Sequence, residues 1–263
     1  LLEFSPDVLI SGTAAFALIL VRMTGLFIIS PVFGRSNVPV YLKIGFSVIM
    51  SLILINTVQD YDLSYISNIY QFALTVLKEF ITGLMIGFVS YIFFSVIYLG
   101  GQLIDVQIGF SMVNVLDPTS NTQISITSNF YYIISMIIFL GIRGHHVLIK
   151  AVFDSYEFVP LGGAVFDDRI VEDFIRIFGE VLVTGVKVAA PVTAAVLLTD
   201  VALGILSKTI PQMNIFIVGM PLKIIMGIVI IMLSLPLFFM LLEMLFNGMN
   251  EEITNFIKTI GTG

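Results

Sequence analysis

Few side chains in this sequence could act as acids, bases, nucleophiles or metal ligands. The imidazoles are those of His145 and His146, and cysteine is absent. Adjacent histidines project about 100° apart on a helix, and no third ligand stands at a recognisable spacing, so we expect no metal site. No serine lies in a Gly-x-Ser-x-Gly turn, and no aspartate pair occupies the centre of apolar runs. The sequence therefore predicts no catalytic residues, no cofactor and no enzyme activity.

Four charged side chains stand within or near apolar runs, namely Arg22, Lys187, Asp200 and Glu243. An unpaired ion is expensive in such a setting, so these groups are expected to face a protein interior, a partner or water. Lys187 and Asp200 carry opposite charges on either side of Pro191, and we predict a buried ion pair between them. The alternative is snorkelling to a membrane interface or contact with another subunit, since long side chains can reach that far.

The composition is that of an integral membrane protein. Hydrophobic residues make up 58% of the chain, charged residues make up 11%, and the mean hydropathy is +1.06. The apolar runs could supply about six spans of roughly 20 residues within a single membrane domain, residues 1–263. The formal charge of −6 is scattered and leaves no basic stripe, so nucleic acid is not an expected partner.

The first two apolar runs differ in length. Residues 8–30 follow a capping serine and a helix-starting proline, and they are long enough for one span. No basic cluster precedes this run, so we expect a retained helix and not a secretory signal. The second run, residues 44–58, is short for a full span.

The third apolar run, residues 72–99, contains Gly83 and Gly87 at small-xxx-small spacing. This spacing permits close contact between helices, although it is common in apolar sequences. Gly100 and Gly101 follow directly, and we expect the run to end or break there.

The C-terminal half contains one region that is too long for an ordinary span, residues 177–206. Pro191 lies inside it and favours a kink, with a broken helix or a hairpin as the alternatives. The charged stretch before it, residues 154–176, is expected to be a solvent-facing connection. Residues 247–263 are expected to be a polar tail.

A polar segment, residues 102–129, lies between two strongly apolar stretches, and 15 of its 28 residues are Gln, Asn, Asp, Ser or Thr. Irregular polar backbone at membrane depth is tolerated only inside protein or beside a water-filled cavity. Partner subunits are the simplest source of that protection. The distribution of Lys and Arg does not decide the orientation in the membrane.

Several short motifs occur in a fixed order and spacing: Pro31-Val-Phe-Gly34, Gly100-Gly-Gln-Leu-Ile-Asp-Val-Gln-Ile-Gly109, Leu116-Asp-Pro118, Gly144-His-His146, Pro211-Gln-Met-Asn-Ile-Phe216 and Gly219-Met-Pro221. Together, over roughly residues 8–245, they resemble the FliR family of type III export-gate subunits. The injectisome members of this family are similar, so an injectisome export-gate subunit is an alternative. A secondary transporter is a less favoured alternative, because the acidic residues do not converge on one depth.

The resemblance implies an all-α membrane protein with long kinked helices and helical hairpins, packed in a helical export-gate assembly. It implies a FliP-like part, about residues 1–176, and a FliQ-like part, about residues 177–246. The implied partners are FliP, FliQ and FlhB-like subunits, membrane lipid and the unfolded proteins that pass through the gate. The implied location is the bacterial inner membrane, multi-pass, in the flagellar basal body.

The resemblance also implies that the polar segment reaches into the central pore and helps to close it. We predict a pore plug loop in which apolar side chains supply bulk and polar side chains hold the loop in place. The alternative is an ordinary polar connection with an Asp-Pro turn. The predicted plug residues are Gly109, Phe110, Ser111, Met112, Val113, Asn114, Val115, Leu116, Asp117 and Pro118.

Overall fold

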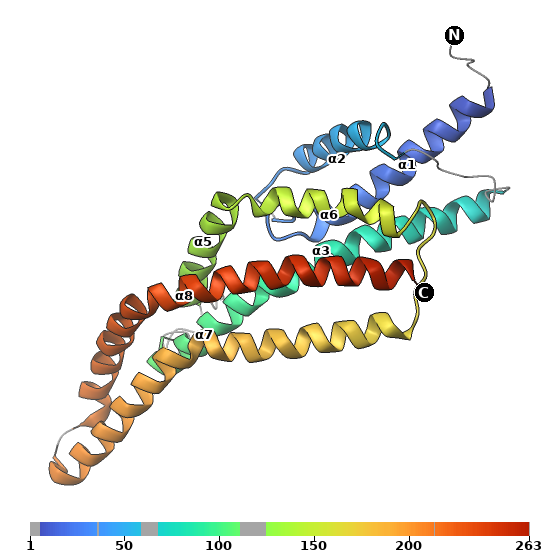
Figure 1. The fold of residues 1–263 in the computed structure, drawn as a ribbon. Helices are drawn as coiled ribbons and strands as arrows, with labels where there is room; N and C mark the ends of the chain where they lie inside the picture. The colour runs from blue at the N-terminus through green and yellow to red at the C-terminus, as the bar shows by residue number, and fades with distance from the viewer. Residues whose placement is uncertain (1–5, 36, 59–67, 111–124, 213, 263) are drawn as a thin grey trace. The chain divides into compact units, whose positions relative to one another are not determined.

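The computed structural model describes residues 6–35, 37–58, 68–110, 125–212 and 214–262. All regular elements among them are α-helices, which confirms the predicted all-α fold class (Figure 1). The helices are α1 (Pro6–Ile29), α2 (Val40–Leu54), α3 (Ile69–Ile108), α5 (Ile126–Gly141), α6 (Gly144–Phe158), α7 (Asp168–Thr209) and α8 (Ile215–Gly261).

Within the described ranges, four helices are long and apolar enough to cross a membrane: α1, α3, α7 and α8. A fifth span results if α5 and α6, which a short break separates, are counted together. The sequence predicted about six. The difference arises because α2 has only 15 residues, or about 22 Å at 1.5 Å per residue, which is short of a hydrocarbon core of about 30 Å.

The chain forms two compact units that are interleaved along the sequence. Unit 1 comprises residues 1–92, 142–177 and 248–263, and unit 2 comprises residues 93–141 and 178–247. Two junctions, near residues 177 and 247, lie close to the predicted limits of the FliQ-like part. Unit 2 also contains an earlier segment, however, so the division into FliP-like and FliQ-like parts stays a prediction.

In unit 1, α1 crosses the first part of α3 at glycines. A Cβ atom added to Gly25 would lie 2.7 Å from the carbonyl oxygen of Phe80, and one added to Gly83 would overlap the backbone of Arg22. A Cβ on Gly87 would meet the side chain of Ile29 at 2.5 Å. The close helix contact that the Gly83 and Gly87 spacing permits is therefore present in the structure.

In unit 2, aromatic rings form much of the core. The Phe94 ring lies 5.2 Å from that of Phe139 and 5.5 Å from that of Phe246. Tyr131 stacks on Phe238 with a ring separation of 4.2 Å. These contacts join α3, α5 and α8. Aromatic pairs at such distances stabilise the fold by more than the apolar area that they bury.

The expectation that the third run ends or breaks at Gly100 and Gly101 is wrong, because α3 continues to Ile108. A Cβ atom on Gly101 would overlap the backbone of Ser128. The glycines therefore allow a neighbouring helix to approach and do not interrupt their own.

The region around Pro191 is one continuous helix, α7, and the broken-helix and hairpin alternatives are wrong. The helix begins at Asp168, inside the stretch that was expected to be a connection. Within unit 2, α7 and α8 run side by side as a hairpin that turns between Thr209 and Ile215 (Figure 1).

The predicted polar tail is also wrong, because residues 247–261 continue α8. Met249, Ile253, Phe256 and Ile260 recur at helical spacing and are almost fully buried in unit 1. Four apolar positions on one face are enough to pack this segment, although its other faces are polar.

Candidate functional site

Arg22 of α1 forms a buried ion pair with Glu79 of α3. Its Nε lies 2.6 Å from Glu79 Oε2, and its Nη2 lies 3.0 Å from Oε1. Both side chains are 0% exposed. This two-point geometry matches the planar guanidinium to the carboxylate. The sequence indicated that Arg22 must face an interior, a partner or water, but it did not identify Glu79.

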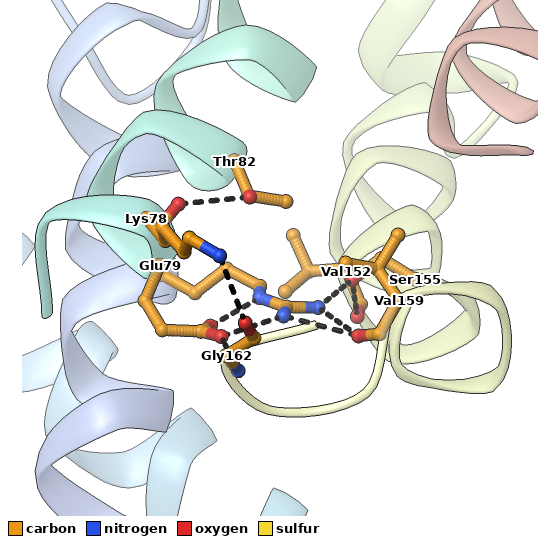
Figure 2. A network of polar contacts seen from close by, with 8 residues as sticks. Lys78, Glu79, Thr82, Val152, Ser155, Val159 and Gly162 are labelled. Atoms are coloured by element: carbon orange, nitrogen blue, oxygen red, sulfur yellow. Dashed lines mark hydrogen bonds and ion pairs between the residues drawn. The ribbon is translucent and has the colours of Figure 1, made fainter. Parts of the chain in front are cut away.

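The end of α6 completes this network (Figure 2). Arg22 Nη1 donates to Ser155 Oγ at 2.9 Å, and the carbonyl oxygen of Val159 accepts from the guanidinium at 3.1–3.2 Å. The backbone N–H of Gly162 donates to Glu79 Oε1 at 2.7 Å. The guanidinium also lies 4.0 Å from the ring centre of Tyr156. The network therefore ties α1, α3 and α6 together, and its role in unit 1 is structural.

Asp105, near the end of α3, anchors the start of α5 in unit 2. The side chain is 3% exposed, and its carboxylate accepts from Ser125 Oγ at 2.5 Å and from the Thr127 backbone N–H at 3.2 Å. A carboxylate at a helix N-terminus pairs N–H groups that lack a partner within the helix. Ser128 Oγ adds a bond to the carbonyl oxygen of Tyr98 at 2.8 Å.

The predicted plug loop begins at this anchor. Gly109 has a φ of +98°, which favours glycine, and its N–H donates to the carbonyl oxygen of Asp105 at 3.1 Å. Gly109 and Phe110 are described, whereas the rest of the predicted plug, residues 111–118, lies outside the described residues. The Asp105 carboxylate thus bonds to Ser125 and Thr127, and its backbone carbonyl bonds to Gly109, contacts that its place in the GGQLIDVQIG motif did not reveal.

Asp200 of α7 pairs with Lys223 of α8, not with Lys187. The Lys223 Nζ atom lies 2.5 Å from Asp200 Oδ1, and both side chains are partly exposed. The pair lies beside an open cavity of about 560 Å³ within unit 2, which is lined in part by Ile108, Gly109 and Met220. The carboxylate therefore meets its counter-ion across the hairpin.

Lys187 and Asp200 are not brought together because they lie on one helix. They are 13 positions apart, which corresponds to about 20 Å along the axis. The side chain of Lys187 is exposed, as is that of Glu243 on α8. The structure therefore leaves Lys187 on the surface of unit 2.

His145 and His146 lie at the start of α6 with ring centres 4.2 Å apart. In the described portion of the chain, no group of three or more His, Asp or Glu side chains could hold a metal ion. The two rings are preceded by Arg143, whose φ of +61° marks the turn between α5 and α6.

Most of the chain matches a known protein family. The model of the family described as bacterial export proteins, family 1, matches residues 13–249. The chain belongs to this family. The matched range includes both the Arg22 network and the Asp105 anchor.

Individual relatives agree with this family. The flagellar biosynthetic protein FliR of Bacillus subtilis (strain 168) is 30% identical over 250 residues, which cover 94% of this chain and 96% of the relative. FliR of Escherichia coli (strain K12) is 25% identical over 242 residues, 92% and 90% of the two chains. FliR of Pectobacterium carotovorum subsp. carotovorum is 24% identical over 267 residues, 100% of each. The resemblance to the FliR family inferred from short motifs is confirmed.

Proposed function

We propose that this chain is a core subunit of the flagellar type III protein export gate in the bacterial inner membrane. The observation that carries the proposal is the match to FliR proteins over nearly the whole chain, together with the export-protein family. In this proposal the chain crosses the membrane several times and assembles with FliP and FliQ, in contact with an FlhB-like subunit. Together they form the channel through which unfolded flagellar proteins leave the cell.

The exposed surface of α2 supports assembly with other subunits. Ser47 and Ser51 are buried, whereas large apolar side chains such as Tyr41, Ile49 and Leu52 are at least half exposed. The helix is too short to span a bilayer, so lipid alone would not cover all of this surface. Apolar helices of neighbouring subunits would cover it.

The α7–α8 hairpin supports the same assembly. In the most apolar 18-residue stretch of each helix, only 33% of the residues of α7 and 17% of those of α8 are buried within the chain. Hairpins with so little internal cover are suited to packing against other helices in a multi-subunit membrane assembly.

Purification from membranes of cells that contain the complete export apparatus tests the proposal. We expect the tagged chain to co-purify with FliP and FliQ, and to be unstable when it is produced without them. Deletion of its gene should stop export of flagellar proteins. A stable isolated chain that moves a small solute into liposomes, and that recovers no gate subunit, would contradict the proposal and favour a transporter.

Within this gate, residues 109–118 would act as the plug of the closed pore. A pore wide enough for a polypeptide would leak ions when idle, unless its constriction is blocked or dewetted. Phe110, Met112 and Val113 would supply apolar bulk, and methionine adapts to irregular gaps. The described anchor at Asp105 would hold the base of this segment.

Deletion of residues 110–116 is expected to raise membrane permeability to ions several-fold in cells that produce the full gate. The physical reason is loss of the apolar block, and the measurement is uptake of a small dye or a change in membrane potential. A matched variant that replaces Met112 and Val113 by serine keeps the loop length and should also leak. Normal assembly without increased leak in either variant would refute the plug role.

A further inference from the structure

We propose that the surface of α7 formed by Lys187, Ala190 and Ala194 docks a membrane helix of a partner subunit that presents a carboxylate to Lys187. This inference rests on the proposed function, because it requires a partner subunit in the export gate. We call these three residues the α7 docking face.

The three residues of the α7 docking face occupy neighbouring positions on one side of the helix. Spacings of three, four and seven residues place side chains one above the other. All three are exposed in unit 2. The ion pairs formed by described residues do not include Lys187, so its ammonium group has no acidic partner in this part of the chain.

Pro191 removes a backbone hydrogen-bond donor at the same place. Proline has no N–H, so it cannot donate to the carbonyl oxygen of Lys187, the helical acceptor four residues earlier. At membrane depth, backbone groups that lose their helical partner are usually paired with a neighbouring helix or with water. The ammonium group of Lys187 thus has no acidic partner among the described residues, and the carbonyl oxygen of the same residue lacks its usual donor four positions later.

The small side chains of Ala190 and Ala194 allow those partners to come close. Small residues four positions apart let two membrane helices approach until their backbones are almost in contact. The next exposed turns of α7 instead carry large apolar side chains, including Leu197, Leu198 and Val201, each more than half exposed. On the C-terminal side of Lys187 the small residues thus come first and the bulky ones follow, while Val183 and Val186 on its N-terminal side are large and more than half exposed.

The charge of Lys187 determines the chemistry of the partner. A lysine in an apolar span is costly unless it meets an opposite charge, an acceptor or water, and a carboxylate satisfies both its charge and its donors. Snorkelling to lipid headgroups would relieve the ammonium group, but it would not replace the N–H that Pro191 removes from the carbonyl of Lys187. A helix with Asp or Glu at this level, and a hydrogen-bond donor beside it, satisfies both.

The test uses the complete gate purified from membranes. Lys187→Arg is expected to recover partner subunits within about twofold of wild type, because the charge is retained. Lys187→Met should reduce recovery several-fold, and Lys187→Glu should reduce it at least tenfold. An acid-to-lysine change in the partner should then restore recovery with Lys187→Glu. Lys150→Met is the matched control, since Lys150 is an exposed lysine of unit 1 whose side chain is 76% accessible.

A photo-crosslinker at Ala190, with Lys187 unchanged, keeps the test decisive where a Lys187 variant fails to accumulate. We expect it to capture a partner subunit, and capture of lipid alone would overturn the proposal. Recovery of partners by Lys187→Met and Lys187→Glu at the wild-type level would overturn it as well. A failure of the proposed function would give a different result from a failure of this inference. In that case the wild-type chain itself would recover no gate subunit.

Discussion

Arg22→Ala is expected to lower strongly the amount of folded chain that accumulates in the membrane. The change leaves the Glu79 carboxylate buried without its counter-ion, and removal of one partner of a buried pair destabilises by about 3–5 kcal/mol. Ser155 Oγ and the carbonyl oxygen of Val159 would lose a donor as well. The measurement is the amount of chain in washed membranes, followed by its thermal midpoint in detergent.

Three variants separate the ion pair from general intolerance at this position. Arg22→Lys keeps the charge but loses the two-point contact, so an intermediate loss is expected. The double variant Arg22→Met with Glu79→Leu removes both charges, and it should be more stable than either single change. Lys150→Ala removes one partner of an exposed pair and should change little. If Arg22→Ala accumulates and melts like wild type, the network does not stabilise unit 1.

Gly83→Ala is expected to lower the thermal midpoint clearly, although it adds only one methyl group. Its Cβ would overlap the backbone of Arg22 where α1 and α3 cross, and backbone cannot move aside as a side chain can. Overpacking of this kind destabilises by about 1–3 kcal/mol. The separation of the two helices would also lengthen the contact between Arg22 and Glu79.

Gly45→Ala is the matched control for Gly83→Ala. Gly45 also lies within a helix, but an added Cβ would meet nothing within 4 Å. Since alanine is the better helix former by about 1 kcal/mol, this variant should be neutral or slightly more stable. Equal thermal midpoints for the two alanine variants would contradict a close crossing at Gly83.

The apolar composition was sufficient to predict the membrane class. The order and spacing of short motifs carried the resemblance to the FliR family, and that resemblance implied the all-α fold. Hydropathy and turn residues are local properties of the sequence, so they can be interpreted without knowing which helices pack against each other. The spacing of Gly83 and Gly87 likewise showed that a close helix contact was possible, because small residues four positions apart lie on one surface of a helix.

Only the tertiary structure decided which groups meet. Arg22 and Glu79 are 57 residues apart, and no local sequence feature near either residue identifies the other as its partner. Asp200 and Lys187 looked like partners because they are near in sequence, but a continuous α7 holds them apart and the hairpin brings Lys223 to Asp200 instead.

Tertiary packing also explains why the predicted helix break at Gly100 and Gly101 and the predicted polar tail were wrong. Gly100 and Gly101 would break an isolated helix, yet Gly101 lies where the backbone of Ser128 leaves no room for a side chain. The segment 247–261 has the composition of a tail, but its buried face packs in unit 1 and keeps it helical. Local propensity is worth about 1 kcal/mol per residue, and packing against a distant part of the chain outweighs it.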